Sequence, residues 1–221
     1  SLTVEPNNAF ALIEQVRLAA YQKNESLVKD RAEYLIKVYP NNNKALRLYF
    51  GVNRNDVALE KLMSAHQLDT ADLQKAMLVS EAFVSLKKAD KALQILRPFE
   101  KNEKLPKRYW QLLVLIYKSQ QDGSNAQLTL EKWRKVSPFH LEPVVLLADV
   151  HTSKGNYERA LSVVNSGFEH HQNNLTLQLV KMHLLLTNKE LYQAKELYRT
   201  LAERDIHDAL KQGLQGRLYL L

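Results

Sequence analysis

Alanine recurs at intervals of 34 residues along the chain, and this periodicity constrains the fold more than any other feature. The alanines in phase are Ala58, Ala92, Ala126, Ala160 and Ala194. A large side chain follows each of them four residues later, in the order Leu62, Leu96, Leu130, Val164 and Tyr198. An aromatic residue stands nine residues before three of them, at Tyr49, Phe83 and Tyr117. Internal similarity at such a period is the signature of a protein made of stacked repeats.

Each interval contains two stretches with apolar residues at helical spacing. In one interval these residues are Trp110, Leu113, Val114 and Tyr117, followed by Ala126, Leu130 and Trp133. The segment between the two stretches, 121–124, predicts a turn in which Gly123 is free to take a positive φ. The small alanine lets the two helices of a pair approach closely. Because one pair cannot bury its own apolar face, the sequence predicts an all-α solenoid of stacked antiparallel pairs.

The interval 107–140 also resembles the tetratricopeptide repeat (TPR). Its Trp110-x-x-Leu113-Val114-x-x-Tyr117 stretch fits the family pattern W-x2-L-G-x2-Y, with valine in the glycine position. Ala126, Leu130, Trp133 and Pro138 then follow in register. The resemblance implies a right-handed TPR-like α-solenoid over the whole chain, 1–221. Its units are expected at about 5–38 (out of register), 39–72, 73–106, 107–140, 141–174 and 175–208, with 209–221 as a capping helix or a truncated next helix.

In TPR proteins the first helix of each pair lines a concave groove, so the resemblance implies a protein or peptide partner there. The family's groove positions correspond to Glu81, Arg108, Gln111, Leu112, Leu115, Lys118, Val145, Leu146, Asp149, Leu179 and His183. Leu112, Leu115, Leu146, Asp149 and Leu179 are the expected contact strip. Co-chaperone TPR domains hold the terminal carboxylate of heat-shock chaperones with a Lys and Asn pair. That pair is absent, so this partner is not expected.

The net charge of +7 is concentrated in the middle of the chain, where residues 71–140 carry 13 basic and 7 acidic side chains. Within it, a basic patch is predicted at Lys87, Lys88, Lys91, Lys101, Lys104 and Lys107, in turns or on a second helix. One alternative function is therefore anion or nucleic-acid binding through the basic segment 87–108, although specific nucleic-acid recognition is not expected. A structural role in self-assembly, through 209–221 or the terminal units, is the other alternative.

The remaining motifs indicate no chemistry. The chain has no Cys, and its glycines form no phosphate-binding loop. His151 occupies the repeat position of Tyr117, which predicts core packing, and the other histidines show no ligand spacing. We therefore expect no catalytic residue, metal or cofactor, and no enzymatic activity. Pro98 predicts a kink or an early end of the helix around residues 90–104.

No apolar stretch reaches the length of a membrane span, so the sequence is expected to be soluble. The chain begins at Ser1 and ends in mid-pattern at Leu221, which predicts a segment of a larger protein. Composition leaves the compartment undetermined. The divergent repeats without cysteine resemble those of TPR proteins from the bacterial cell envelope. The location is therefore left unassigned, with the bacterial cell envelope or periplasm as the alternative.

Overall fold

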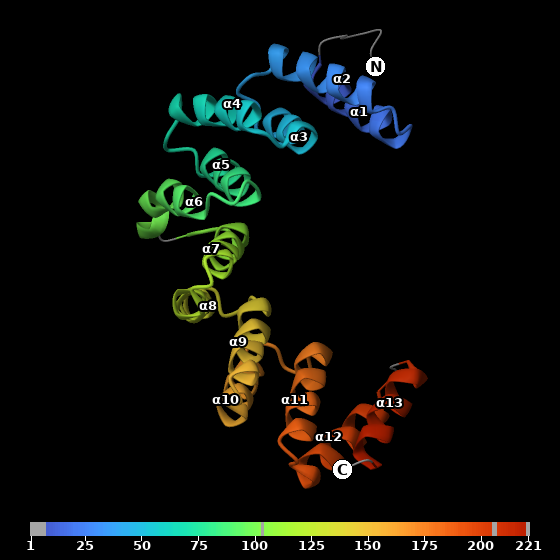
Figure 1. Ribbon diagram of the computed structural model, residues 1–221. Helices are drawn as coiled ribbons and strands as arrows, with labels where there is room; N and C mark the ends of the chain where they lie inside the picture. Colours follow the sequence, from blue (N-terminus) through green and yellow to red (C-terminus); the bar gives the residue numbers. More distant parts are fainter. Residues whose placement is uncertain (1–7, 103, 205–206, 220–221) are drawn as a thin grey trace. The chain divides into compact units, whose positions relative to one another are not determined.

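The computed structural model describes residues 8–102, 104–204 and 207–219, and these are helical, with turns between the helices and no strand (Figure 1). The chain divides into two compact units, Ser1–Gly123 and Ser124–Leu221. The all-α class predicted from the sequence is therefore confirmed. No helix in the described ranges combines the length and apolar character of a membrane span.

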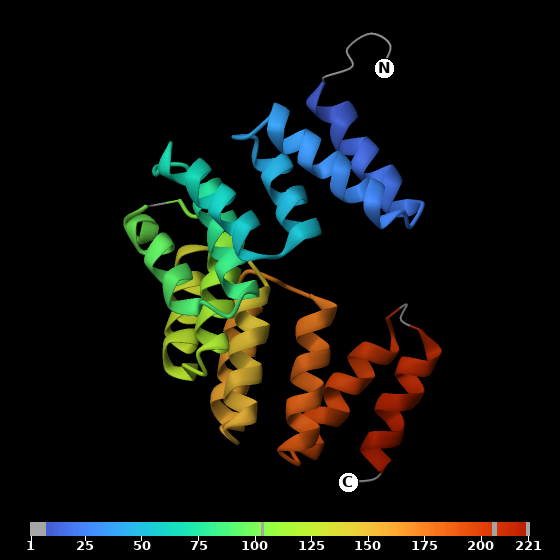
Figure 2. The same ribbon diagram turned by 45° about the horizontal axis from the view of Figure 1, so that its top comes forward.

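The helices follow one another in pairs (Figures 1 and 2). The first unit contains α1 (Ala9–Tyr21), α2 (Glu25–Val38), α3 (Asn43–Asn53), α4 (Asp56–Gln67), α5 (Leu73–Ser85), α6 (Ala89–Leu96), the 3-10 helix η1 (Arg97–Lys101) and α7 (Lys107–Ser119). The second unit contains α8 (Gly123–Val136, its first residue being the last of the first unit), α9 (Glu142–Ser153), α10 (Tyr157–Gly167), α11 (Leu175–Thr187), α12 (Leu191–Ala202) and α13 (Asp208–Tyr219).

Asparagine and aspartate side chains start many of these helices. Each accepts hydrogen bonds from backbone N–H groups of the first turn, which have no partner within the helix. The residues in this role are Asn8, Asn24, Asn42, Asn55, Asp72 and Asn174. The starts of these six helices are thus encoded locally, before any packing between helices.

From α5 and α6 onward, the turn inside each pair repeats with the same period as the alanines. A left-handed residue occurs at Lys87, Gln121, Gly155 and Lys189, each 34 residues after the last. The residue after it donates its N–H to a carbonyl five residues earlier, as Asp122 does to Tyr117 at 2.9 Å, which is a Schellman closure of the first helix. The turn expected at 121–124 is therefore present, but Gly123 does not use the positive φ that is open to it. Gln121 takes that conformation because it occupies the closing position, and Gly123 begins α8.

Pro98 ends α6 as the sequence predicted. The α-helix stops at Leu96, and the chain continues as the 3-10 helix η1, with Pro98 in its first turn. Proline removes one backbone donor and its ring clashes with the preceding turn, so the α-helical ladder cannot continue. The second helix of this pair is consequently short, and η1 and a loop connect it to α7.

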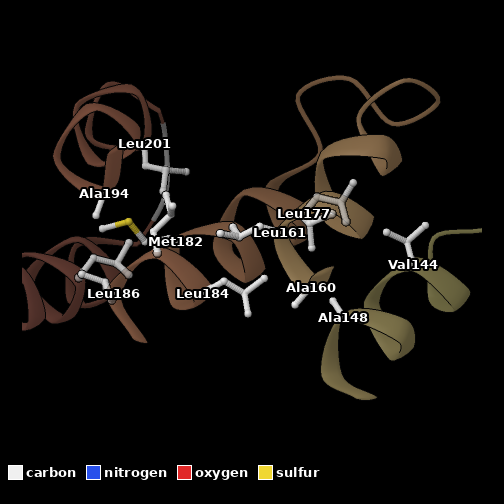
Figure 3. Packing of buried hydrophobic residues seen from close by; sticks show 13 residues of the cluster. Val144, Ala148, Ala160, Leu161, Leu177, Met182, Leu184, Leu186, Ala194 and Leu201 are labelled. Carbon is white, nitrogen blue, oxygen red and sulfur yellow. The ribbon is translucent and has the colours of Figure 1, made fainter. Parts of the chain in front are cut away.

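The recurring alanines lie in the core. Ala58, Ala92, Ala126, Ala160 and Ala194 are all buried. In the second unit, Figure 3 shows Ala148 and Ala160 on the paired helices α9 and α10, with Leu177 and Met182 of α11 in the same cluster. Alanine leaves room for two backbones to approach, and the larger residues around it fill the remaining space.

Successive first helices pack against one another in the first unit. Here α1 contacts α3, α3 contacts α5, and α5 contacts α7, while α2, α4 and α6 each pack between first helices. Figure 1 shows α3, α5 and α7 following one another along one side, with α4 and α6 on the other. The first helices of this unit therefore form one continuous surface.

Gly167 supports a close approach that a methyl group would obstruct. A Cβ there would lie 2.8 Å from Val144 Cγ1 and 3.1 Å from Leu177 Cδ1. Gly167→Ala is expected to lower the free energy of unfolding by about 1 kcal/mol, because overpacking outweighs the better helix propensity of alanine. Gly213→Ala in α13, where no atom lies within 4 Å, is the control and should raise stability. Chemical denaturation of both variants measures the difference; equal changes would contradict this role of Gly167.

Candidate functional site

The predicted groove residues of the first unit lie on two adjacent helices. Glu81 is on α5, and Arg108, Gln111, Leu112, Leu115 and Lys118 are on α7. Residues at this spacing share one side of a helix. Leu115 is 51% exposed, and Arg108 and Lys118 are also exposed. The prediction that Leu112 contacts a partner is wrong. Leu112 is only 2% exposed, because it lies at the border of the stripe of α7 that packs into the core, and it offers no surface for contact.

An ionic cluster joins three successive first helices. Arg47 Nη1 of α3 lies 2.7 Å from Glu81 Oε2, and Arg108 Nε of α7 lies 2.8 Å from Glu81 Oε1. The Glu81 side chain is 17% exposed, whereas those of Arg47 and Arg108 are 52% and 56% exposed. The hydrogen bond from Arg108 to Glu81 also raises the pKa of the guanidinium. Each pair contributes at most about 1 kcal/mol at this exposure, but together they hold both arginines in place.

We call the exposed side of α3, α5 and α7 the first-helix surface. It consists of Lys44, Arg47, Glu81, Arg108, Gln111, Leu115 and Lys118. It combines an exposed leucine with a preformed charged cluster. Arg47 stands 34 residues before Glu81, so the repeat period itself places the two side chains on neighbouring helices.

The second unit presents the remaining predicted groove residues on α9 and α11. Val145, Leu146 and Leu179 are half-buried, while Asp149 and His183 are exposed. His183 Nδ1 lies 3.3 Å from both terminal nitrogens of Arg217, which is on α13. The sequence interpretation missed Arg217, although it stands 34 residues after His183 and the period could have identified it. Because α9 contacts α11, the predicted groove residues of these two helices lie on adjacent helices within this unit.

The predicted basic patch does not gather in one place. Lys87, Lys88 and Lys91 lie at the start of α6, and Lys88 is ion-paired with Asp56. Lys101 is the last residue of η1, Lys104 follows it, and Lys107 is the first residue of α7. The eight residues of α6 alone span about 12 Å, and η1 lengthens the separation, so the two groups lie at opposite ends of this segment.

Grooves also form between second helices, which sequence reasoning did not identify. In the first unit a groove of about 930 Å³ lies between α2 and α4, lined by Tyr34, Ile36, Val57, Ala65 and Leu68 among others. In the second unit a smaller groove between α8 and α10 has His151 of α9 in its lining. The grooves arise because second helices pack on first helices rather than closely on each other.

His151 and His66 are buried, which confirms the core position predicted for His151. Burial lowers the pKa of both imidazoles, and for His151 the nearby Arg159 and Lys154 lower it further. The Nδ1 atom of each ring has no hydrogen-bond partner among the described residues. Within the same residues, no three His, Asp or Glu side chains gather as a metal site would require.

Because the pKa of both histidines is lowered in the folded chain, we expect the protein to lose stability in mild acid. The unfolded chain takes up protons near the ordinary pKa of 6.5, whereas the folded chain resists protonation until a lower pH. The free energy of unfolding should therefore fall as the pH drops below about 6.5, and level off below the folded pKa. His151→Phe should flatten this dependence, as measured by thermal unfolding across the pH range. An unchanged slope would show that His151 does not contribute.

The similarity of this chain to known proteins lies in its fold. No protein-family model matches the sequence, and a comparison with curated proteins gave no match. Among solved structures, the chain is similar to one in the Naa15/Naa10 structure bound to HypK-THB, with 17% identity and a TM-score of 0.57. That alignment covers 98% of this chain but 35% of the other.

Two bacterial structures are similar over most of both chains. The PilF protein of Pseudomonas aeruginosa shares 15% identity at a TM-score of 0.57, covering 94% of this chain and 96% of its own. A tetratricopeptide repeat protein from Parabacteroides merdae ATCC 43184 shares 14% identity at a TM-score of 0.55, covering 99% and 88%. At these identities the likeness concerns the fold, which is that of a divergent TPR-like α-solenoid.

Proposed function

We propose that this protein is a non-catalytic scaffold that binds a segment of a partner protein on its first helices. The observation that carries the proposal is the first-helix surface of α3, α5 and α7, where Leu115 is exposed on α7 about two turns after Arg108 of the Arg47–Glu81–Arg108 cluster. An exposed apolar side chain next to held charged groups is the composition of a recognition surface.

The surface is formed before any partner arrives. Glu81 fixes two long arginine side chains, and both rest on helices that pack against each other. A receptor that is already ordered loses little conformational entropy on binding, so more of the contact energy appears as affinity. The Naa15/Naa10 structure, similar in fold, is itself bound to HypK-THB, which accords with a binding role for this kind of fold.

In the second unit, Val145, Leu146, Asp149, Leu179 and His183 are proposed as a further contact surface. Their mixture of half-buried apolar and exposed polar side chains is of the same kind. Each of the two surfaces is proposed to bind a partner on its own.

The test is affinity capture of partner proteins from a cell extract with matched variants of the full chain. Leu115→Asp is expected to weaken capture at least about tenfold, because a charge would replace the exposed apolar contact. Leu68→Asp, at a leucine that is 74% exposed beside the α2–α4 groove, is the control and should capture normally. Loss of capture by the Leu68 variant alone would place binding on the second helices and contradict the proposal.

A further inference from the structure

The first helices of the first unit carry most of its excess positive charge. Together α3, α5 and α7 contain a single acidic residue, Glu81. Their basic residues are Lys44, Arg47, Lys75, Lys107, Arg108 and Lys118. The second helices α2, α4 and α6 are balanced, with acidic Glu25, Asp30, Glu33, Asp56, Glu60 and Asp90 against basic Lys29, Arg31, Lys37, Lys61 and Lys91.

Part of that positive charge is neutralised inside the protein. Lys75 lies 3.2 Å from Asp72 and 3.7 Å from Asp69, and Lys107 also has an interaction within the chain. Lys44 and Lys118 form no ion pair with any residue that the structure describes. The first-helix surface therefore presents four cationic side chains against the one carboxylate of Glu81.

Arg47 and Arg108 are arranged to hold a second carboxylate. Among the described residues Glu81 is the hydrogen-bonding partner of each guanidinium, and each donates through one nitrogen, Nη1 of Arg47 and Nε of Arg108. A guanidinium has five N–H donors in a rigid fork, so most donors of both side chains still point to solvent or to a ligand. Both side chains are about half exposed, and Glu81 limits their rotamers.

We propose that the first-helix surface of the first unit binds an acidic segment of a partner protein, whose Asp or Glu carboxylates are bound by Arg47 and Arg108 while an apolar neighbour contacts Leu115. This inference rests on the proposed function and names the chemistry of its partner. Lys44, one turn before Arg47, and Lys118, one turn after Leu115, extend the positive charge on either side. Carboxylates bind arginine in paired, charge-assisted hydrogen bonds.

A protein segment fits this surface better than a nucleic acid. Single-stranded nucleic acids use exposed aromatic rings on which bases stack. On α3, α5 and α7 the aromatic residues Tyr49, Phe50, Phe83, Tyr109 and Trp110 are buried, and Tyr117 is half-buried. The exposed large apolar side chain on the surface is Leu115, which suits an aliphatic contact.

The experiment measures binding of short labelled peptides to the full chain by fluorescence anisotropy. One peptide alternates Leu with Glu, its counterpart replaces every Glu with Gln, and a single-stranded RNA of similar length is the third probe. The Glu peptide is expected to bind, more weakly as salt increases, and an amidated C-terminus should leave its affinity unchanged. Equal binding of the Gln peptide, or tighter and Arg47-dependent binding of the RNA, would overturn the proposal.

Four variants locate the site. Arg47→Gln combined with Arg108→Gln should weaken the Glu peptide about tenfold or more, and adding Glu81→Gln should not restore it. Glu81→Gln alone should strengthen binding, because the amide oxygen still accepts a hydrogen bond from an arginine while the carboxylate that competes with the ligand is gone; weaker binding would contradict the proposal. Lys87→Gln combined with Lys91→Gln, at the start of α6, removes the same charge elsewhere and should leave binding unchanged. Circular dichroism confirms that each variant is folded.

Failure of this inference is distinguishable from failure of the proposed function. If Leu115→Asp abolishes capture of cellular partners while the double arginine variant captures normally, the scaffold role stands and the acidic partner is wrong. If neither change affects capture, the first-helix surface of the first unit is not the binding site.

Discussion

Replacing Trp133 with alanine is expected to lower the free energy of unfolding by about 3–5 kcal/mol, the largest effect of a single side chain considered for the second unit. Trp133 of α8 is fully buried, so truncation removes a large apolar surface and leaves a cavity. Its indole Nε1 also donates to His140 Nδ1 at 2.8 Å, and the two rings meet edge to face with centroids 5.7 Å apart. Chemical and thermal denaturation measure the loss.

Trp133→Phe separates the two contributions. Phenylalanine retains most of the buried apolar surface but cannot donate to His140, so the expected loss is smaller, about 1–2 kcal/mol. A loss below about 1 kcal/mol for Trp133→Ala would show that the helices around α8 close over the cavity, contrary to this account of the core.

The second large effect is expected from Ala160→Leu, which should lower stability by about 1–3 kcal/mol. Ala160 of α10 is fully buried, and α10 packs on α9, where Ala148 is buried in the same cluster. Leucine and alanine have nearly equal helix propensities, so the loss reports the space between the helices rather than the helix itself.

Ala209→Leu is the matched control for that variant. Ala209 is exposed at the start of α13, in the same unit, so the same added atoms meet solvent. Its stability should change by less than about 0.5 kcal/mol. Similar losses for both variants would show that the recurring alanine is not required by close helix packing.

The fold could be predicted from the sequence because the repeat amplifies a weak local signal. A single alanine indicates little, but five in phase predict a buried position in five successive repeats, and all five are buried. Pro98 acts locally, so its effect on α6 was predictable as well. The glycine of the 121–124 turn does not mark its left-handed residue, because the position within the repeat, and not the residue type, determines which residue is left-handed. Gly155 stands 34 residues after Gln121, and that alignment identifies the position correctly.

The candidate site was less predictable, because exposure depends on the neighbouring helix. Leu112 and Leu115 are one turn apart with the same side chain, yet only Leu115 is exposed. The charge of the first-helix surface was hidden for another reason. Charges counted along the sequence combine first and second helices, whereas the fold sorts them onto different sides of the unit. The pairing of Arg47 and Arg108 through Glu81 emerges only when three helices are brought together.

The groove between α2 and α4 has a mechanical consequence for the first unit. Its first helices are joined by direct packing, but on the opposite side α2 and α4 leave a gap between them. A change in the width of that gap leaves the packing of α3 on α5 in place, so we expect bending there to cost less free energy than sliding α3 past α5, which would break buried contacts. We therefore expect the first unit to change its curvature more easily than the register between its first helices. The spacing of Arg47 and Arg108 should then be kept when the unit bends.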